Sequence, residues 1–296
     1  KQKEEVIRQM KTGTVDIMIG THSLIQEGIG FKSLGLAIID EQHRFGVKQR
    51  EILKSYGSPH LINMTATPIP RSLTMTAYAD LDSSIIDELP PGRQKIETVA
   101  LSNIRRDELI TKMKKNSQEG RQIYWVCTLI EESEALRAES AEKTFTYLSD
   151  NLEDEKVVMI HGRLNKSEKE TIMQDFSNGK IDLLVATTVI EVGVNVPNAS
   201  LMVVENAERL GLAQLHQLRG RVGRGAEKSV CILMYQSPLS ETAKQRLDIL
   251  RQSNDGFMIA QKDLELRGPG EILGTQQTGI ASMKIANIVR DSYLLK

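Results

Sequence analysis

Residues 156–189, KVVMIHGRLNKSEKETIMQDFSNGKIDLLVATTV, join two apolar runs through a more polar segment. The runs at 156–162 and 181–189 have the length and apolar content of buried strands. The polar segment between them predicts a helix over residues 166–176. A strand, a helix and a second strand in this order indicate a βαβ unit of a parallel sheet.

The same alternation of strand and helix extends in both directions from this unit. Aromatic residues make up only 4% of the chain, and smaller apolar side chains supply most of its apolar mass, which suits sheets buried on both faces. The long segment 133–148 carries acids and small residues on several faces, so we interpret it as a solvated helix. Further helices are predicted at 105–117 and 212–218, and further strands at 15–20, 36–40, 61–67, 96–101, 122–127, 200–206 and 229–235.

The segment DELPPGRQ, residues 87–94, interrupts this pattern, because its two prolines and its glycine exclude a helix and suit an exposed connection. A chain of 296 residues also exceeds what one hydrophobic core usually organises. We therefore predict an α/β protein with tandem doubly wound parallel sheets, followed by a tail of helical composition. The predicted regions are 1–90, 91–236 and 237–296.

Charge and cysteine content restrict the class of protein. The net charge of −1 and the pI of about 6.6 give no bulk signature of nucleic-acid binding, so any DNA contact must be local. Cys127 and Cys231 lie in separate apolar runs without metal-ligand spacing, which predicts buried thiols in a reducing compartment. The charged opening KQKEEVIRQMK is no signal sequence, and no apolar run is long enough to cross a bilayer. We expect a cytoplasmic protein without a membrane partner, whose opening, an amphipathic helix without a start Met, lies inside a longer chain.

An acidic pair follows the predicted strand at 36–40. Parallel sheets bind ligands at the carboxyl ends of their strands. At such a position Asp40 can hold the Mg²⁺ of a nucleotide, while Glu41 can orient or deprotonate an attacking water. For an isolated acidic pair, a helix N-cap is the better explanation. The interpretation therefore depends on what accompanies the pair.

Two further polar clusters accompany it. Thr65 and Thr67 follow the third predicted strand, and QLRGRVGR occupies residues 217–224. Arg221 and Arg224 are three residues apart, which predicts a shared helix face, and a guanidinium reaching across a cleft can neutralise charge developing on a γ-phosphate. By itself, this segment could also be a basic turn that binds nothing or any polyanion. Three such clusters in this order are more specific than any one of them.

Four stretches resemble motifs II, III, V and VI of superfamily 2 helicases, in that order. They are DEQH (40–43), TATPIPR (65–71), ATTVIEVGVNVP (186–197) and HQLRGRVGRG (216–225). More narrowly, DEQHRFGVKQR, MTATPIPR, WVCTLIEESE and QKDLELRGPGEILG are similar to the RecG family of branch-migrating helicases. The transcription-repair coupling factor, the nearest rival, typically carries Glu-Glu-Gln where this chain has Glu-Gln-His, so His43 favours the RecG family. The resemblance implies tandem RecA-like units with doubly wound parallel sheets, the first of them truncated, followed by a C-terminal helical hairpin that serves translocation.

The resemblance also implies roles for residues of motifs II and III. Asp40 would help to hold Mg²⁺, and Glu41 would position or activate the water. His43 would link the nucleotide site to Thr65 and Thr67, which sense the state of that site.

Motif V would contact both the DNA and the nucleotide. Thr187 and Thr188 would face the DNA backbone, whereas Glu191 and Gly193 would approach the nucleotide, with glycine permitting close backbone approach. Asn195 stands where the family usually has an acid, and its amide can still accept a hydrogen bond from ribose.

The remaining implied roles concern catalysis and coupling. Motif VI would supply Gln217, Arg221 and Arg224, of which the two arginines would reach the γ-phosphate. Arg267 would couple the translocation motif to the nucleotide site. Thr21 lies in a segment that resembles motif Ib and would contact the phosphate backbone, although it could equally cap a helix.

The implied activity is that of an ATP-dependent DNA helicase acting in recombination and repair. The cofactors would be ATP and Mg²⁺, and the partners branched DNA (replication forks and Holliday junctions) and single-stranded DNA-binding protein. No stretch of this sequence fits the phosphate-binding loop GxxxxGK[ST], which in family order precedes motif II, so we expect no ATP hydrolysis by the chain alone. A second hypothesis is a non-catalytic binding module with a degenerate site. The complete charged set of motifs II and VI argues against it, and Asn195 is its one support.

Overall fold

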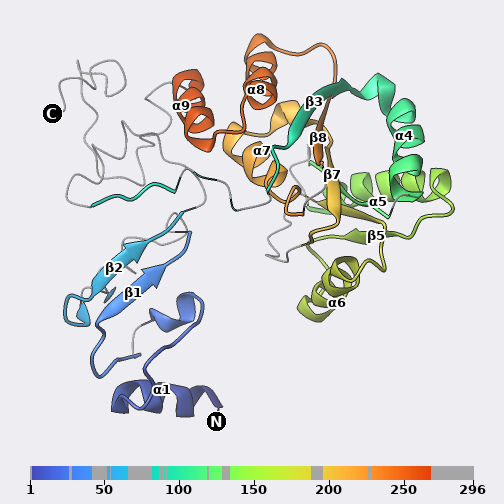
Figure 1. The fold of residues 1–296 in the computed structure, drawn as a ribbon. Helices are drawn as coiled ribbons and strands as arrows, with labels where there is room; N and C mark the ends of the chain where they lie inside the picture. Colours follow the sequence, from blue (N-terminus) through green and yellow to red (C-terminus); the bar gives the residue numbers. More distant parts are fainter. Residues whose placement is uncertain are drawn as a thin grey trace. The chain divides into compact units, whose positions relative to one another are not determined.

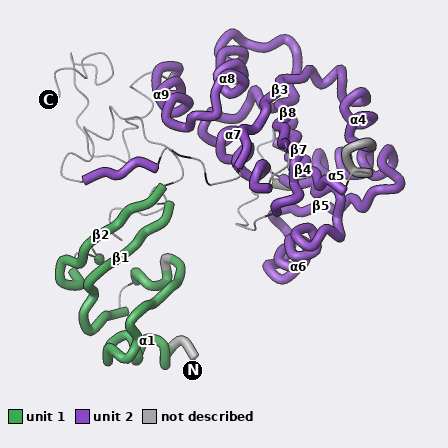
Figure 2. The backbone as a smooth tube through the Cα atoms, in the orientation of Figure 1, with its two compact units in different colours: residues 1–68 green, residues 69–296 purple. Residues whose placement is uncertain are grey.

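The computed structural model of the chain contains two compact units, residues 1–68 and 69–296 (Figures 1 and 2). Each unit has its own parallel sheet. The structure describes residues 2–26, 29–41, 52–53, 55–65, 82–86, 88, 90, 93–118, 120–128, 134–187, 196–225 and 228–267.

The described part of the first unit contains the helix α1 (Gln2–Thr12), further helical residues at 52–53 and 55, and a parallel pair of strands. The two strands pair over four residues each and lie at the apolar runs that predict them. The described elements are α1 (Gln2–Thr12), the 3-10 turn η1 (His22–Leu24), β1 (Leu36–Ile39) and β2 (His60–Asn63).

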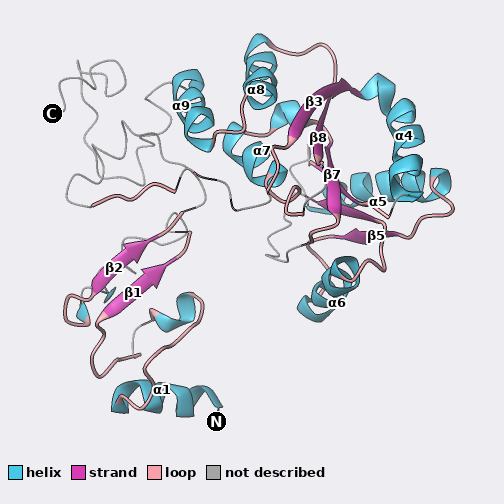
Figure 3. Ribbon diagram, viewed as in Figure 1, coloured by secondary structure: helices cyan, strands magenta, loops and turns pink. Residues whose placement is uncertain are grey.

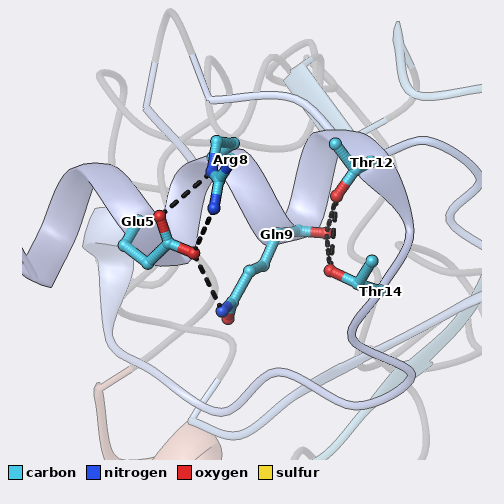
Figure 4. Close-up of polar contacts among 5 residues, drawn as sticks. All are labelled: Glu5, Arg8, Gln9, Thr12 and Thr14. Carbon is cyan, nitrogen blue, oxygen red and sulfur yellow. Dashed lines mark hydrogen bonds and ion pairs between the residues drawn. The ribbon is translucent and has the colours of Figure 1, made fainter.

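Short-range polar contacts stabilise α1 (Figure 4). Glu5 accepts hydrogen bonds from the guanidinium of Arg8 at 3.0 and 2.7 Å and from the amide of Gln9 at 3.2 Å. The hydroxyls of Thr12 and Thr14 both donate to the backbone carbonyl of Gln9, at 3.2 and 3.4 Å. The same carbonyl accepts the backbone N–H groups of Gly13 and Thr14 at 3.0 and 3.1 Å, so this carbonyl of the last turn is hydrogen-bonded by residues beyond the helix end. The opening segment is therefore a helix, as predicted.

The prediction of a strand at residues 15–20 is wrong. Ile17 and Ile19 lie in an irregular segment and are 81% and 90% exposed. Among the described residues the sheet of this unit consists of β1 and β2 alone, and neither pairs with the segment. An alternating apolar pattern suits a strand, but the backbone also needs a neighbouring strand to take its hydrogen bonds.

The second unit contains a six-stranded parallel sheet with the strand order β3-β8-β7-β4-β6-β5. Every residue of β4 and of β7 is buried, as expected of central strands covered on both faces. Each of the six strands overlaps a predicted run, and no strand extends more than one residue beyond its run. They are β3 (Glu97–Ser102), β4 (Gln122–Cys127), β5 (Val157–Ile160), β6 (Leu183–Thr187), β7 (Ala199–Val204) and β8 (Val230–Tyr235).

Helices cover both faces of this sheet (Figure 3). Trp125 of β4 packs among side chains of α4 and α5 on one face, and the adjacent Tyr124 packs among those of α6, α7, α8 and α9 on the other. The doubly wound arrangement predicted for this region is therefore confirmed. The helices are α4 (Arg106–Gln118), α5 (Glu134–Asn151), α6 (Lys166–Ser177), α7 (Leu212–Arg219), α8 (Glu241–Gln252) and α9 (Gly256–Arg267).

The interpretation of residues 133–148 as a solvated helix is wrong. Ala141 and Leu148 of α5 are completely buried, and Phe145 packs against the same core. These three side chains are spaced four and three residues apart, which places them on one helix face. The apolar face is narrow and the other faces carry acidic residues, so the sequence pattern did not identify this helix as packed against the core.

Both cysteines are free and buried, as predicted. Burial raises the pKa of Cys231 to about 12 and that of Cys127 well above its usual value. Neither thiol is therefore a reactive thiolate near neutral pH. In the described part of the chain, no helix combines the length and the apolar character needed to cross a membrane.

We expect proteases to cleave the first unit before the second. Leu36, Ile38 and Ile62 of its two strands are 49%, 58% and 47% exposed. A two-stranded sheet is marginally stable, whereas the six-stranded sheet has a core on each face. Limited digestion with thermolysin, followed by mass spectrometry, should leave a fragment that contains residues 97–252. Loss of both units at the same rate would contradict this expectation.

Candidate functional site

The acidic pair lies at the carboxyl end of β1, as predicted. Asp40 is exposed, Glu41 is half-buried, and the backbone N–H of Glu41 donates to Asp40 Oδ1 at 2.9 Å. The φ angle of Glu41 is 53°, in the left-handed region, which costs a non-glycine residue about 1–3 kcal/mol. Such strain concentrates at functional sites, and it therefore supports a role for Glu41. His43 lies outside the described residues.

Thr65 lies at the same edge of the sheet as the acidic pair. The backbone N–H of Met64 donates to the carbonyl of Ile39 at 2.7 Å, so the ladder between the strands continues to this point. Asp40 and Thr65 directly follow these two residues, and both are exposed. The parallel pairing thus brings the motif II and motif III segments together. Thr67 lies outside the described residues.

Thr21 stands immediately before η1. Its carbonyl accepts from the backbone N–H of Leu24 at 2.9 Å, and its hydroxyl lies 3.2 Å from that of Ser23. Both hydroxyls are at the surface. This geometry is compatible with the two roles considered for Thr21, a phosphate contact and a helix cap.

The two motif VI arginines lie in a turn, so the prediction that they share a helix face is wrong. α7 ends at Arg219, and Gly220 is its C-cap. The φ angle of Gly223 is 74°, and a Cβ at this position would lie 2.8 Å from Ile96 Cγ1. Only glycine fits this backbone and this contact. The helix therefore stops before Arg221, and the basic segment continues as a turn.

The charges of both arginines nevertheless act on the same residue, Tyr124. Burial raises the pKa of the Tyr124 hydroxyl to about 12, and the charges of Arg221 and Arg224 both act to lower it. Arg224 is exposed, and its Nε donates to the Gly220 carbonyl at 3.4 Å. Gln217 is exposed on α7. Both guanidinium charges act on one tyrosine hydroxyl, so the turn carries local positive charge, as an anion-binding role requires.

Arg219, between these residues in the sequence, has a different role that the motif pattern did not reveal. Its side chain is 2% exposed, and its Nη1 donates to the carbonyls of Leu250 and Ser253, both at 2.8 Å. Nη1 also lies 3.3 Å from the hydroxyl of Thr98 on β3. Arg219 therefore ties α7 to the end of α8. Its position seven residues after the buried Leu212, on the apolar face of α7, is a signal that could have identified it.

His216 is kept neutral mainly by its burial, with a contribution from this arginine. Its Nδ1 accepts from Arg219 Nη2 at 2.9 Å. Burial is the main cause that lowers the pKa of His216 from 6.5 to about 4, the charges of Arg219 and Arg93 contribute, and Asp255 opposes them. As the pH falls below 6.5, the unfolded chain binds a proton that the folded protein takes up only near pH 4. Stability is therefore lost across this window.

We expect His216→Gln to remove this part of the pH dependence. Glutamine can accept the hydrogen bond from Arg219, but it does not titrate. Between about pH 7.5 and about pH 4.5, the wild type should lose about 2 kcal/mol more unfolding free energy than the variant. Urea denaturation at the two pH values measures the difference. Equal losses in the two proteins would show that His216 is not kept neutral by the fold.

A second cluster that the sequence pattern did not reveal lies at the carboxyl edge of the six-stranded sheet. Glu205 directly follows β7 and pairs with Arg106 at the start of α4. The guanidinium of Arg106 lies 5.3 Å from the ring centroid of Trp125 and 5.2 Å from that of Tyr147. The hydroxyl of Thr128, directly after β4, donates to the Glu205 carbonyl. The signal in the sequence is a charged residue directly after a fully apolar strand.

Thr187 is the described DNA-contact candidate of motif V. It ends β6, is half-buried, and lies opposite Cys127 of β4 in the sheet register. Thr128, which follows Cys127 in the chain, donates to the Glu205 carbonyl. Thr187 therefore lies at the same carboxyl edge of the sheet as Glu205 and Thr128. Arg267 is the last residue of α9. The other motif V candidates lie outside the described residues: Thr188, Glu191, Gly193 and Asn195.

Three family models match the chain in sequence order. The DEAD/DEAH box helicase model matches residues 1–76. The helicase conserved C-terminal domain model matches residues 104–226. The model of ATP-dependent DNA helicase RecG, domain 3, C-terminal, matches residues 253–296.

Curated relatives match over the whole chain. ATP-dependent DNA helicase RecG of Haemophilus influenzae is 56% identical over 301 residues, which cover 100% of this chain and 43% of the relative. The RecG of Escherichia coli K12 is 59% identical, with 96% of this chain and 42% of the relative covered. The RecG of Bacillus subtilis is 48% identical, with 100% and 44% covered. The chain thus spans less than half the length of these relatives.

Solved structures agree with this assignment. RecG bound to a three-way DNA junction is 43% identical to this chain with a TM-score of 0.73, and the match covers 99% of this chain and 38% of that one. Dbp5 of S. cerevisiae bound to RNA and ADP BeF3, at 15% identity and a TM-score of 0.51 over 85% of this chain and 61% of its own, shares the fold alone. The predicted tandem RecA-like fold is therefore confirmed. By its similarity along its whole length, the chain belongs to the RecG family of superfamily 2 helicases.

Proposed function

We propose that the chain is the motor portion of an ATP-dependent DNA helicase that branch-migrates and regresses stalled replication forks and Holliday junctions. The observation that carries this proposal is the likeness of 99% of the chain to a RecG solved on a three-way DNA junction. Because the chain spans less than half the length of its relatives, the activity is proposed for a protein of their full length.

ATP and Mg²⁺ are the cofactors of this proposal. Mg²⁺ in nucleotide sites is commonly bound by one or two carboxylates together with phosphate oxygens, and the exposed Asp40 at a strand end fits this donor set. When bound, the ion neutralises charge on the phosphates. Glu41 orients or deprotonates the attacking water. Arg224, together with Arg221 and Gln217 of the same motif, stabilises the charge that develops on the γ-phosphate. The roles implied for His43, Thr67, Thr188, Glu191, Gly193, Asn195 and Arg267 stay predictions.

DNA contacts of the motor are proposed to be with the backbone. Thr21 and Thr187 offer hydroxyls, which bind phosphates without reading sequence, as a translocating enzyme requires. Three functional regions, 1–90, 91–236 and 237–296, remain part of the proposal, and the three family matches in the same order support them. A cytoplasmic location and an interaction with single-stranded DNA-binding protein are also proposed, on the family resemblance alone.

Two rival functions lead to different expectations. The relatives that match over the whole chain are RecG proteins at 48% to 59% identity, which favours this family over the transcription-repair coupling factor. A non-catalytic binding module would retain DNA binding without ATP turnover. The left-handed backbone of Glu41 and the two motif VI arginines, whose charges act on the same tyrosine, favour catalysis. A degenerate site has no reason to retain either feature.

A chimera tests the proposal. This chain would replace the matched stretch of Haemophilus influenzae RecG, and the chimera should hydrolyse ATP faster with a three-way DNA junction than without DNA. The 296-residue chain alone is the control, and no turnover is expected from it because its sequence has no phosphate-binding loop. A folded chimera that binds the junction without hydrolysing ATP would establish the binding module instead. Robust turnover by the chain alone would refute the expectation that the loop is absent.

A further inference from the structure

One backbone carbonyl in the motif VI turn accepts hydrogen bonds from two arginines. Arg93 Nη2 donates to the Gly220 carbonyl at 3.3 Å, and Arg224 Nε donates to the same oxygen at 3.4 Å. A carbonyl has two lone pairs and can serve both donors. Both distances are longer than those of typical N–H···O bonds, so each bond is weak.

The two arginines differ in their freedom to leave this carbonyl. Arg93 is half-buried, whereas Arg224 is exposed. Two guanidinium groups that share an acceptor repel each other, which favours the departure of the more exposed one toward an anion. When Arg224 leaves, Arg93 keeps the Gly220 carbonyl hydrogen-bonded. The contact therefore reduces the cost of releasing Arg224 from the turn.

A second contact supports the turn from the same segment. Ile96 is buried and packs closely against Gly223, where a Cβ would lie 2.8 Å from Ile96 Cγ1. The backbone N–H of Glu97 then donates to the carbonyl of Ser229 at 3.0 Å. Residues 93–97 thus contact the turn at two positions. Arg93 donates a hydrogen bond to Gly220, and Ile96 makes an apolar contact with Gly223.

We propose that Arg93 is a positioning residue for Arg224, which holds the Gly220 carbonyl so that Arg224 is free to bind the phosphate charge. This inference rests on the proposed ATP hydrolysis. Without Arg93, Arg224 has no competitor for the carbonyl and becomes more firmly bound to it. The variant should therefore be slower in the chemical step and not weaker in ATP binding.

Activity of the chimera gives the first test. Arg93→Gln should lower kcat for junction-stimulated ATP hydrolysis roughly 10- to 100-fold, the scale of a misplaced catalytic group, with little change in KM for ATP. Arg93→Lys keeps a charged donor and should restore most of kcat. Lys95→Gln, an exposed neighbour in the same segment, is the matched control and should behave as wild type. Unchanged kcat in Arg93→Gln would overturn the proposal. The proposal would also be overturned if kcat and the thermal midpoint fell together in both Arg93→Gln and Arg93→Lys. That result would show that Arg93 only stabilises the fold.

Nuclear magnetic resonance of the 296-residue chain gives a test that needs no activity. In Arg93→Gln, the Nε–H signal of Arg224 should move downfield and exchange more slowly with solvent, since its bond to Gly220 becomes the only one at that oxygen. The thermal midpoint should stay that of the wild type. An unshifted Arg224 signal would overturn the proposal. An inactive wild-type chimera would instead remove the proposed function, and the resonance result would still decide whether Arg93 controls Arg224.

Discussion

Replacing Arg224 by alanine lowers the junction-stimulated ATP turnover of the chimera by roughly 10³-fold or more, the scale expected for an arginine that stabilises phosphoryl-transfer charge. The side chain is exposed, and its hydrogen bond to the Gly220 carbonyl is long, at 3.4 Å. Its removal should therefore change the unfolding free energy by no more than about 0.5 kcal/mol. Junction binding should be retained. Glu41→Gln, which keeps the shape of the side chain and removes its charge, should abolish turnover in the same way.

The measurement is kcat at saturating ATP and junction, with urea denaturation of each variant in parallel. Arg251→Ala is the control, because Arg251 is an equally exposed arginine of the same unit whose charge pairs with Asp248 on α8. It should leave turnover unchanged. Loss of folding in step with turnover would mark Arg224 or Glu41 as structural. Turnover that survives both substitutions would refute their assignment to catalysis.

Replacing Arg219 by alanine destabilises the second unit by roughly 3–5 kcal/mol, since it leaves several buried polar groups unpaired at once. The carbonyls of Leu250 and Ser253 lose their shared donor, and the half-buried ring of His216 loses the group that donates to its Nδ1. The truncation also opens a cavity between α7 and α8. A loss of this size is a large part of the stability of a typical domain.

Denaturation of the 296-residue chain checks this expectation. Arg219→Met fills much of the same volume without donors, so its difference from Arg219→Ala separates the cavity from the lost hydrogen bonds. The exposed Arg251→Ala is again the control, and its loss should stay within about 1 kcal/mol. Equal stability of the Arg219 and Arg251 variants would show that the contacts at the end of α8 contribute little.

The sheet of the second unit could be predicted from the sequence because its strands are buried on both faces. β4 and β7 are largely apolar and buried along their whole length; the predicted limits of β4 agree with the structure, and those of β7 agree to within two residues. The irregular segment at 15–20 has a comparable apolar pattern but no strand beside it among the described residues. Pairing depends on residues far away in the sequence, so a local pattern cannot determine it.

The candidate site was predicted more fully in composition than in geometry. The ends of β1 and β2 hold Asp40 and Thr65 at one edge, as the rule for parallel sheets predicts. The end of α7 was predicted to within one residue, but the two arginines after it were interpreted as sharing a helix face, although Gly220 and Gly223 signal a helix end. Arg219 differs from its basic neighbours through contacts with α8, some thirty residues later in the chain. Only the tertiary structure shows those contacts.

Branch migration of a three-way DNA junction by the chimera tests the assignment as a helicase motor most directly. With ATP and Mg²⁺, the chimera should convert a labelled junction into its duplex products, as resolved by gel electrophoresis, and the Arg224→Ala chimera should bind the junction without converting it. A wild-type chimera that folds, binds the junction and hydrolyses ATP but leaves the junction intact would contradict the account.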